Sequence, residues 1–138
     1  MSTSIRTYVA VVDDDQSFCR SLDRLLRAAG FHSVTYRTAE DFLHDKKRPQ
    51  FDCLVLDIKL PGISGIELQG QLKAEAVPTP VIFVTSHDSP ELQMQAQATG
   101  CIAYFRKTDP GDALIDSIRR LAMGPSSPKP PFNQGHRF

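Results

Sequence analysis

"YVAVVDDDQSFCRSLDRLLRAAG" (residues 8–30) decides the fold, because it joins a strand-like run, three aspartates and a helix pattern. The run 8–12 is apolar without alternation, as expected of a strand covered on both faces of a parallel sheet. The apolar residues after the aspartates recur at helical spacing, with Asp15 as the expected N-cap and Gly30 as the expected end. The stretch therefore predicts one strand–helix unit of an α/β domain.

Four further runs have the composition of strands, and helical patterns lie between and after them. The runs are residues 32–36, 53–57, 81–85 and 101–105, of which the first is the most polar and suits an edge strand. Helices are expected to begin at the cap residues Thr38, Ser64, Ser89 and Asp109. Strands and helices thus alternate as (βα)5, which predicts a doubly wound three-layer α/β domain.

Composition excludes several classes of function. The chain has 138 residues, enough for one domain with a core, and 16 basic residues balance 16 acidic ones, so no net charge attracts nucleic acid or an anionic membrane. Three separated cysteines without a CxxC pair favour neither disulfides nor zinc, and indicate a reducing compartment. No apolar run reaches 18 residues, and the N-terminus does not read as a signal peptide. We therefore expect a cytoplasmic protein that does not contact nucleic acid or membrane directly.

Residues 124–138 differ in character from the rest of the chain, being rich in proline without a periodic apolar pattern. Such a segment cannot form a core, so we expect a domain over residues 1–123 followed by a disordered tail or the stub of a linker. A proline-rich docking motif is the alternative for this segment. Since no further domain follows the tail, we expect a single-domain protein rather than part of a longer one.

Charged and hydroxyl side chains gather at the ends of the predicted strands. Asp13, Asp14 and Asp15 follow the first strand, Asp57 ends the third, Thr85 ends the fourth, and Lys107 follows the fifth. Ligands of parallel α/β sheets bind beyond the carboxyl ends of the strands, so these side chains should share one crevice. Carboxylates about 5 Å apart repel by roughly 3 kcal/mol at an effective dielectric near 20, so the cluster requires a cation. A solvated acidic turn with Asp15 as a helix cap is the alternative.

The chemistry of these groups fits Mg²⁺ and phosphoryl transfer. Mg²⁺ is usually held by one or two carboxylates and keeps several waters, so Asp14 and Asp57 fit as direct ligands and Asp13 as a ligand through water. Asp57, which ends the central apolar run, is also the candidate nucleophile that would form an aspartyl phosphate. Lys107, the Thr85 hydroxyl and Mg²⁺ would neutralise the charge of the phosphoryl oxygens.

Four motifs, VVDDD, LVLDIKLPGISGIEL, VIFVTS and AYFRK, occur in an order and spacing that resemble the receiver domain of two-component response regulators. The resemblance covers about residues 6–123 and implies a flavodoxin-like three-layer sandwich with parallel strand order 2-1-3-4-5. It also implies that Asp57 takes a phosphoryl group from a histidine kinase or a histidine phosphotransfer protein. The chain would then be a phosphoacceptor that promotes its own phosphorylation and dephosphorylation, rather than an enzyme acting on another molecule.

The resemblance also assigns roles to the site residues. Mg²⁺ would be held by Asp13, Asp14, Asp57 and the backbone carbonyl of Lys59, and the phosphoryl oxygens by Thr85 and Lys107. Thr85 and Tyr104 would form a switch that remodels the face made by the helix after Ser89, the strand 101–105 and the last helix. That face would control a downstream protein target or a phosphorylation-dependent homodimer. A packing role alone is the alternative for Tyr104.

Separate expectations apply to Thr108, Lys59 and His87. Receiver domains usually have Pro after the conserved Lys, whereas Thr108 follows Lys107 here, and we expect this peptide bond to be trans because a cis bond before Thr costs roughly 2.5–4 kcal/mol. Lys59 is expected to lean its ammonium over the acyl phosphate and slow hydrolysis. His87 lies where this family tunes dephosphorylation, or is an ordinary loop residue.

The sequence argues against two other kinds of phosphate-binding protein. A haloacid-dehalogenase phosphatase needs a second aspartate where this chain has Lys59, and three aspartates would repel the phosphate of a flavodoxin-type cofactor. Two alternatives remain open. One is a degenerate receiver that acts as an interaction module without phosphorylation, and the other is a receiver fragment of a longer DNA-binding regulator.

Overall fold

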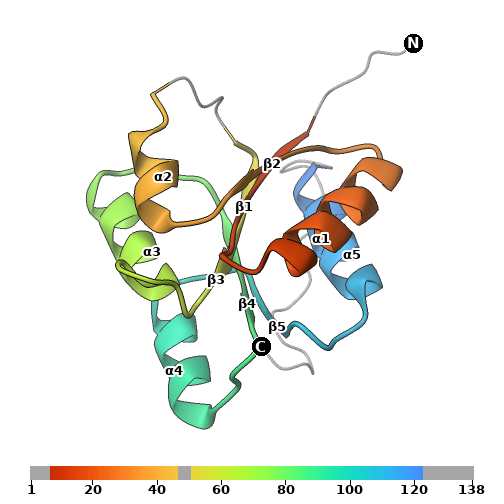
Figure 1. The fold of residues 1–138 in the computed structure, drawn as a ribbon. Helices are drawn as coiled ribbons and strands as arrows, with labels where there is room; N and C mark the ends of the chain where they lie inside the picture. The colour runs from red at the N-terminus through yellow and green to blue at the C-terminus, as the bar shows by residue number, and fades with distance from the viewer. Residues whose placement is uncertain (1–6, 47–50, 123–138) are drawn as a thin grey trace.

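The computed structural model describes residues 7–46 and 51–122, in which five strands and five helices alternate (Figure 1). The strands are β1 (Tyr8–Val12), β2 (His32–Tyr36), β3 (Cys53–Asp57), β4 (Val81–Thr85) and β5 (Ala103–Arg106). The helices are α1 (Gln16–Ala28), α2 (Ala39–His44), α3 (Gly65–Ala74), α4 (Pro90–Ala98) and α5 (Gly111–Ala122). The strands pair in parallel in the order β2-β1-β3-β4-β5, so the predicted flavodoxin-like fold is confirmed.

Helices cover both faces of the sheet, with α2, α3 and α4 on one face and α1 and α5 on the other (Figure 1). Successive side chains of a strand point to opposite faces, so each central strand contributes to two apolar clusters. In β1, Ala10 and Val12 belong to the cluster beneath α2 to α4, whereas Val9 and Val11 belong to the cluster beneath α1 and α5. This burial on both faces explains why the strands lack alternating polarity.

Most of the predicted helix starts are confirmed. The Asp15 side chain caps α1 by accepting a hydrogen bond from the Phe18 N–H at 3.1 Å. Thr38 and Ser89 cap α2 and α4, and Ser64 forms a reciprocal capping box with Glu67 at the start of α3.

Two boundaries differ from prediction. The strand β5 spans Ala103–Arg106 rather than residues 101–105, since its pairing with β4 begins where Ala103 lies opposite Ile82. The Asp109 carboxylate accepts a hydrogen bond from the Arg106 N–H at 2.9 Å, so it closes the turn before α5 instead of capping the helix.

The loop after β5 contains the Lys107–Thr108 bond. No peptide bond among residues 7–46 and 51–122 is cis, so the trans prediction for this bond is confirmed. The Lys107 N–H donates to the Thr85 carbonyl at 2.9 Å, and the Asp109 N–H donates to the Arg106 carbonyl at the same distance. These backbone bonds turn the chain toward α5.

The segments beyond these ranges include the predicted tail, residues 124–138, which lies outside the described residues along with the boundary at residue 123. No helix in the described part of the chain is long and apolar enough to cross a membrane.

Glycine is required where α3 begins, directly behind the end of β3. A Cβ placed on Gly65 would lie 2.2 Å from the Asp57 carbonyl oxygen, which is too close for any side chain. The Gly65 N–H also donates to the Ile58 carbonyl at 3.0 Å, so the loop that follows Asp57 folds tightly onto the strand. The close approach thus fixes the backbone on which Asp57 stands.

We predict that Gly65→Ala destabilises the protein by about 1–3 kcal/mol, because overpacking must displace the backbone at Asp57. Gly70→Ala is a matched control in the same helix, since a Cβ there would meet nothing within 4 Å. That control should be neutral or stabilise by up to about 1 kcal/mol, because Ala favours helix interiors over Gly. Urea unfolding measures both, and equal free energies of unfolding for the two variants would contradict the close packing.

Candidate functional site

Strand register brings two buried aspartates side by side at the carboxyl edge of the sheet. Val12 of β1 pairs with Leu56 of β3, so the residues that follow them, Asp13 and Asp57, lie next to each other. Their exposed fractions are only 0% and 3%. Asp14 is exposed, and one carboxylate oxygen of each of the three aspartates lies within 4.8 Å of the others.

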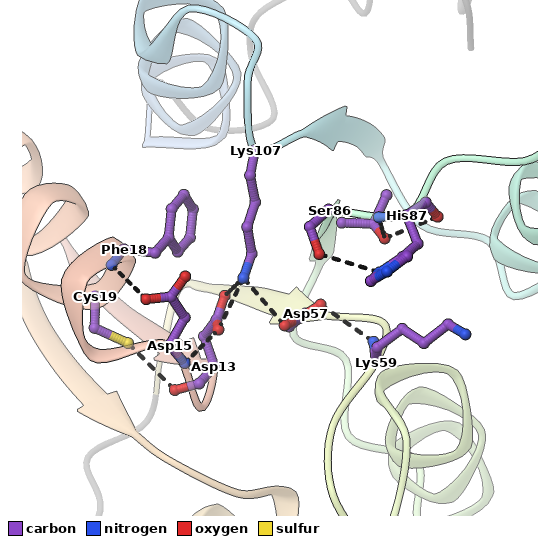
Figure 2. A network of polar contacts seen from close by, with 10 residues as sticks. Asp13, Asp15, Phe18, Cys19, Asp57, Lys59, Ser86, His87 and Lys107 are labelled. Carbon is purple, nitrogen blue, oxygen red and sulfur yellow. Dashed lines mark hydrogen bonds and ion pairs between the residues drawn. The ribbon is translucent and has the colours of Figure 1, made fainter.

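Lys107 bridges the two buried carboxylates (Figure 2). Its Nζ lies 3.0 Å from Asp13 Oδ1, 2.9 Å from Asp13 Oδ2 and 3.2 Å from Asp57 Oδ2. Continuing the alternation of the strands, both aspartates share the side of Val11 and Val55, which α1 and α5 cover. The loop before α5 brings Lys107 from this side, which is why the three charges meet.

The environment alters the pKa of both partners. Burial, followed by the charge of Asp13, raises the pKa of Asp57 from 3.8 to about 6, although Lys107 and the Lys59 N–H act in the opposite direction. Burial alone would lower the pKa of Lys107, but its bonds to Asp13 and Asp57 raise it above the ordinary value. Asp57 is therefore short of positive charge even with Lys107 beside it.

The donor set fits a divalent cation. Asp13 Oδ2 is buried and makes no hydrogen bond, since Lys107 Nζ at 2.9 Å lies outside hydrogen-bonding geometry. Three carboxylates face one ammonium, which leaves two formal negative charges uncompensated. Mg²⁺ prefers carboxylate oxygens, so the residues present suit it.

Lys59 contacts the site through its backbone. Its N–H donates to Asp57 Oδ1 at 3.1 Å, whereas its side chain is exposed and extends away from Asp57 (Figure 2). The predicted contact of its ammonium with an acyl phosphate on Asp57 stays a prediction. The role of the Lys59 carbonyl as a metal ligand stays a prediction.

Thr85 is fully buried at the end of β4, and its hydroxyl is engaged by its own loop. It accepts a hydrogen bond from the His87 N–H at 3.0 Å and donates to the His87 carbonyl at 3.1 Å. The neighbouring Ser86 Oγ lies 3.2 Å from His87 Nδ1 (Figure 2). The Thr85 hydroxyl has one hydrogen, so it must release the His87 carbonyl before it can donate to a group on Asp57.

Tyr104 connects β5 to the same loop. Its side chain is buried, and its hydroxyl donates to Asp88 Oδ1 at 2.8 Å. Burial and the Asp88 carboxylate raise the pKa of Tyr104 above its ordinary value. Arg106 Nη1 lies 4.0 Å from Asp88 Oδ2. Sequence reasoning missed Asp88, whose only signal was its position three residues after Thr85.

Glu40 is a second residue that sequence reasoning missed. From the first turn of α2, its Oε2 accepts a hydrogen bond from the Ile63 N–H at 3.2 Å. The same oxygen occupies the space beside Gly62, where a Cβ would lie 2.5 Å from it and where φ is +75°. Glu40 thus ties α2 to the loop between β3 and α3, which carries Lys59.

Comparisons with known proteins agree with this geometry. A family model described as "Response regulator receiver domain" matches residues 9–119. Two curated relatives come from Bradyrhizobium diazoefficiens. Nodulation protein W is 33% identical over 83% of this chain and 51% of its own length, and transcriptional regulatory protein FixJ is 34% identical over 83% of this chain and 58% of its own. The chain thus spans about half the length of these relatives.

The fold also matches solved structures. One of them, the "BeF3 Activated DrrB Receiver Domain", superposes with a TM-score of 0.78 at 28% identity and covers 87% of this chain and 100% of that chain.

We predict that Asp57→Asn stabilises the protein at neutral pH when divalent cations are absent. Because the pKa of folded Asp57 is raised from 3.8 to about 6, its contribution to stability is fully present below pH 3.8 and is lost as the pH rises through 6. In urea unfolding at pH 7.5, Asp57→Asn should therefore be more stable than the wild type by about 3 kcal/mol, and the difference should vanish near pH 4.

Asp116→Asn provides the control, since it removes the same charge from an exposed position on α5. Its effect should be small and similar at both pH values. A wild type that is as stable as Asp57→Asn at pH 7.5 would contradict the proposed shortage of positive charge around Asp57.

Proposed function

The chain belongs to the response regulator receiver domain family of two-component signalling, and from this premise we propose that Asp57 is its phosphorylation site. The phosphodonor is the phosphohistidine of a histidine kinase or a histidine phosphotransfer protein. The observation that carries the proposal is the bridge of Lys107 between buried Asp13 and Asp57 at the carboxyl edge of the sheet.

In the transfer, a carboxylate oxygen of Asp57 attacks phosphorus and forms a P–O bond. The P–N bond to the donor histidine breaks, and its electron pair stays on the imidazole nitrogen, which takes up a proton. Lys107 already lies 3.2 Å from Asp57 and is placed to pair with the phosphoryl oxygens. Asp13, Asp14, Asp57 and the Lys59 carbonyl would hold Mg²⁺, which would supply further positive charge against those oxygens.

Thr85 and Tyr104 connect the site to an output face. The Thr85 hydroxyl exchanges the bond that it donates to the His87 carbonyl for one to the phosphoryl group, which moves the loop between β4 and α4. That loop includes Asp88, which holds the Tyr104 hydroxyl, so its movement reaches the face formed by α4, β5 and α5. The receiver thus acts as a phosphoacceptor and switch rather than as an enzyme on a separate substrate.

The partner of the output face is a downstream protein or a second copy of the chain in its phosphorylated form. Direct contact with nucleic acid is not proposed, because 16 basic and 16 acidic residues balance. Relatives such as FixJ are named as transcriptional regulators, and the match covers only 58% of FixJ, so a single-domain regulator and the receiver of a longer regulator both fit. We place the protein in the cytoplasm, because Cys19, Cys53 and Cys101 are all free, as in a reducing compartment.

We predict that acetyl phosphate labels the wild type at Asp57 and only in the presence of Mg²⁺. Asp57→Asn should abolish labelling, and Asp14→Asn should reduce it at least tenfold at low millimolar Mg²⁺, roughly the loss expected when one charged ligand is removed. Asp116→Asn should label like the wild type. Phosphate-affinity electrophoresis measures the labelled fraction, and full labelling of Asp57→Asn would refute the assignment.

We also predict that Thr85→Val accepts the phosphoryl group but does not transmit it to Tyr104, because valine has the same shape without the hydroxyl. NMR amide shifts of β5 and α4 on phosphorylation should be largely lost in Thr85→Val and retained in Thr85→Ser, which keeps the hydroxyl. Equal shifts in wild type and Thr85→Val would show that another group drives the loop.

A further inference from the structure

The Phe18 ring lies against the ammonium of Lys107. The Lys107 Nζ lies 4.7 Å from the centroid of the Phe18 ring, beside the same ammonium that bridges Asp13 and Asp57 (Figure 2). An ammonium over a ring face at this distance is attracted by the negative charge density of the ring, and more strongly where water is excluded. Only 12% of the Lys107 side chain is exposed, so this contact is largely shielded from water.

The first turn of α1 fixes the position of the ring. Asp15 caps this turn by accepting from the Phe18 N–H, and the Asp15 N–H itself donates to Asp13 Oδ1 at 2.9 Å. Two hydrogen bonds, each from a backbone N–H to an aspartate side chain, therefore connect Asp13 to Phe18. These bonds hold Phe18 at a fixed position relative to Asp13.

The position of the Lys107 ammonium depends on the side chains around it. Its backbone is held by one bond to Thr85, and Thr108 replaces the proline usual at the next position. The four-carbon side chain must therefore be oriented by what surrounds it. A cavity of about 420 Å³ between α1 and the β5–α5 loop borders both Phe18 and Lys107, and it offers the ammonium a second direction to take.

We propose that Phe18 is a positioning residue for Lys107. Its ring keeps the ammonium over Asp13 and Asp57 instead of letting it turn into the adjoining cavity. Because positive charge already in place need not be reorganised during the reaction, the ring raises the rate at which Asp57 accepts a phosphoryl group. The inference rests on the proposed function of Asp57.

Fluorinated phenylalanines at position 18 test the proposal with little change of ring size. Going from Phe to 4-fluoro-, 3,5-difluoro- and 3,4,5-trifluorophenylalanine progressively weakens the negative ring face. The initial rate of phosphorylation by acetyl phosphate, in which acetate leaves as the Asp57–phosphorus bond forms, should fall in the same order. The full series should cost about threefold to tenfold, as expected for a partly desolvated cation–π contact.

Phe31 provides a matched control, because its ring pairs with Arg119 at 5.8 Å at the other end of α1. The same fluorinated residues at position 31 should leave the rate unchanged. A phosphorylation rate that does not change on fluorination at position 18 would overturn the inference, since packing alone would then explain the position of the ring.

An NMR measurement on the unphosphorylated protein separates this inference from the proposed function. The ring current of Phe18 should displace the signals of the Lys107 CεH₂ group, and Phe18→Leu should return them toward random-coil positions. Unmoved signals would contradict the contact itself. Failure to label Asp57 in the wild type would contradict the proposed function, whereas labelling at a rate indifferent to the ring would contradict only the role of Phe18.

Discussion

Asp13 and Asp57 are buried side by side with the ammonium of Lys107 between them, so positive charge is short at the site. The chemistry of the protein depends on this shortage. Two adjacent carboxylates repel, and burial removes the water that would screen them. One ammonium cannot neutralise both together with exposed Asp14. A divalent cation would relieve this uncompensated negative charge, and the pKa of Asp57 is raised first by burial and then by the charge of Asp13. Under the proposed function, a phosphoryl group on Asp57 would bring further negative charge and redistribute these contacts.

The sheet imposes this arrangement through its register. Val12 opposite Leu56 places the two aspartates next to each other, and the alternation that buries Val11 and Val55 under α1 and α5 turns both carboxylates toward Lys107. Loops around the edge then hold the second layer of contacts. They comprise Glu40 against the β3–α3 loop, Asp88 against Tyr104, and Phe18 against Lys107. The core and the site are therefore consequences of the same strand alignment.

The features predictable from the sequence were those set by local pattern or by sheet topology. Caps such as Asp15 and Ser64 depend on a few neighbouring residues, and the meeting of Asp13, Asp57 and Lys107 follows once the strands are parallel. The contacts of Glu40, Asp88 and Phe18 could not be predicted, because each joins segments whose separation depends on how the loops fold. The hydrogen bond from the Arg106 N–H to Asp109 also escaped prediction, because an aspartate before a helix can close the preceding turn as readily as it caps the helix.

The central claim is that the strand-end acids form one phosphoryl-acceptor site around Asp57. A crystal structure of the protein grown with Mg²⁺ and beryllium trifluoride, which mimics a phosphoryl group on a carboxylate, tests it most directly. We expect beryllium bound to an oxygen of Asp57, Mg²⁺ against Asp13 and Asp14, and the Lys107 ammonium and Thr85 hydroxyl on fluorine. Beryllium trifluoride bound elsewhere, or an Asp57 left in its ion pair with Lys107 under saturating Mg²⁺ and beryllium trifluoride, would contradict the account.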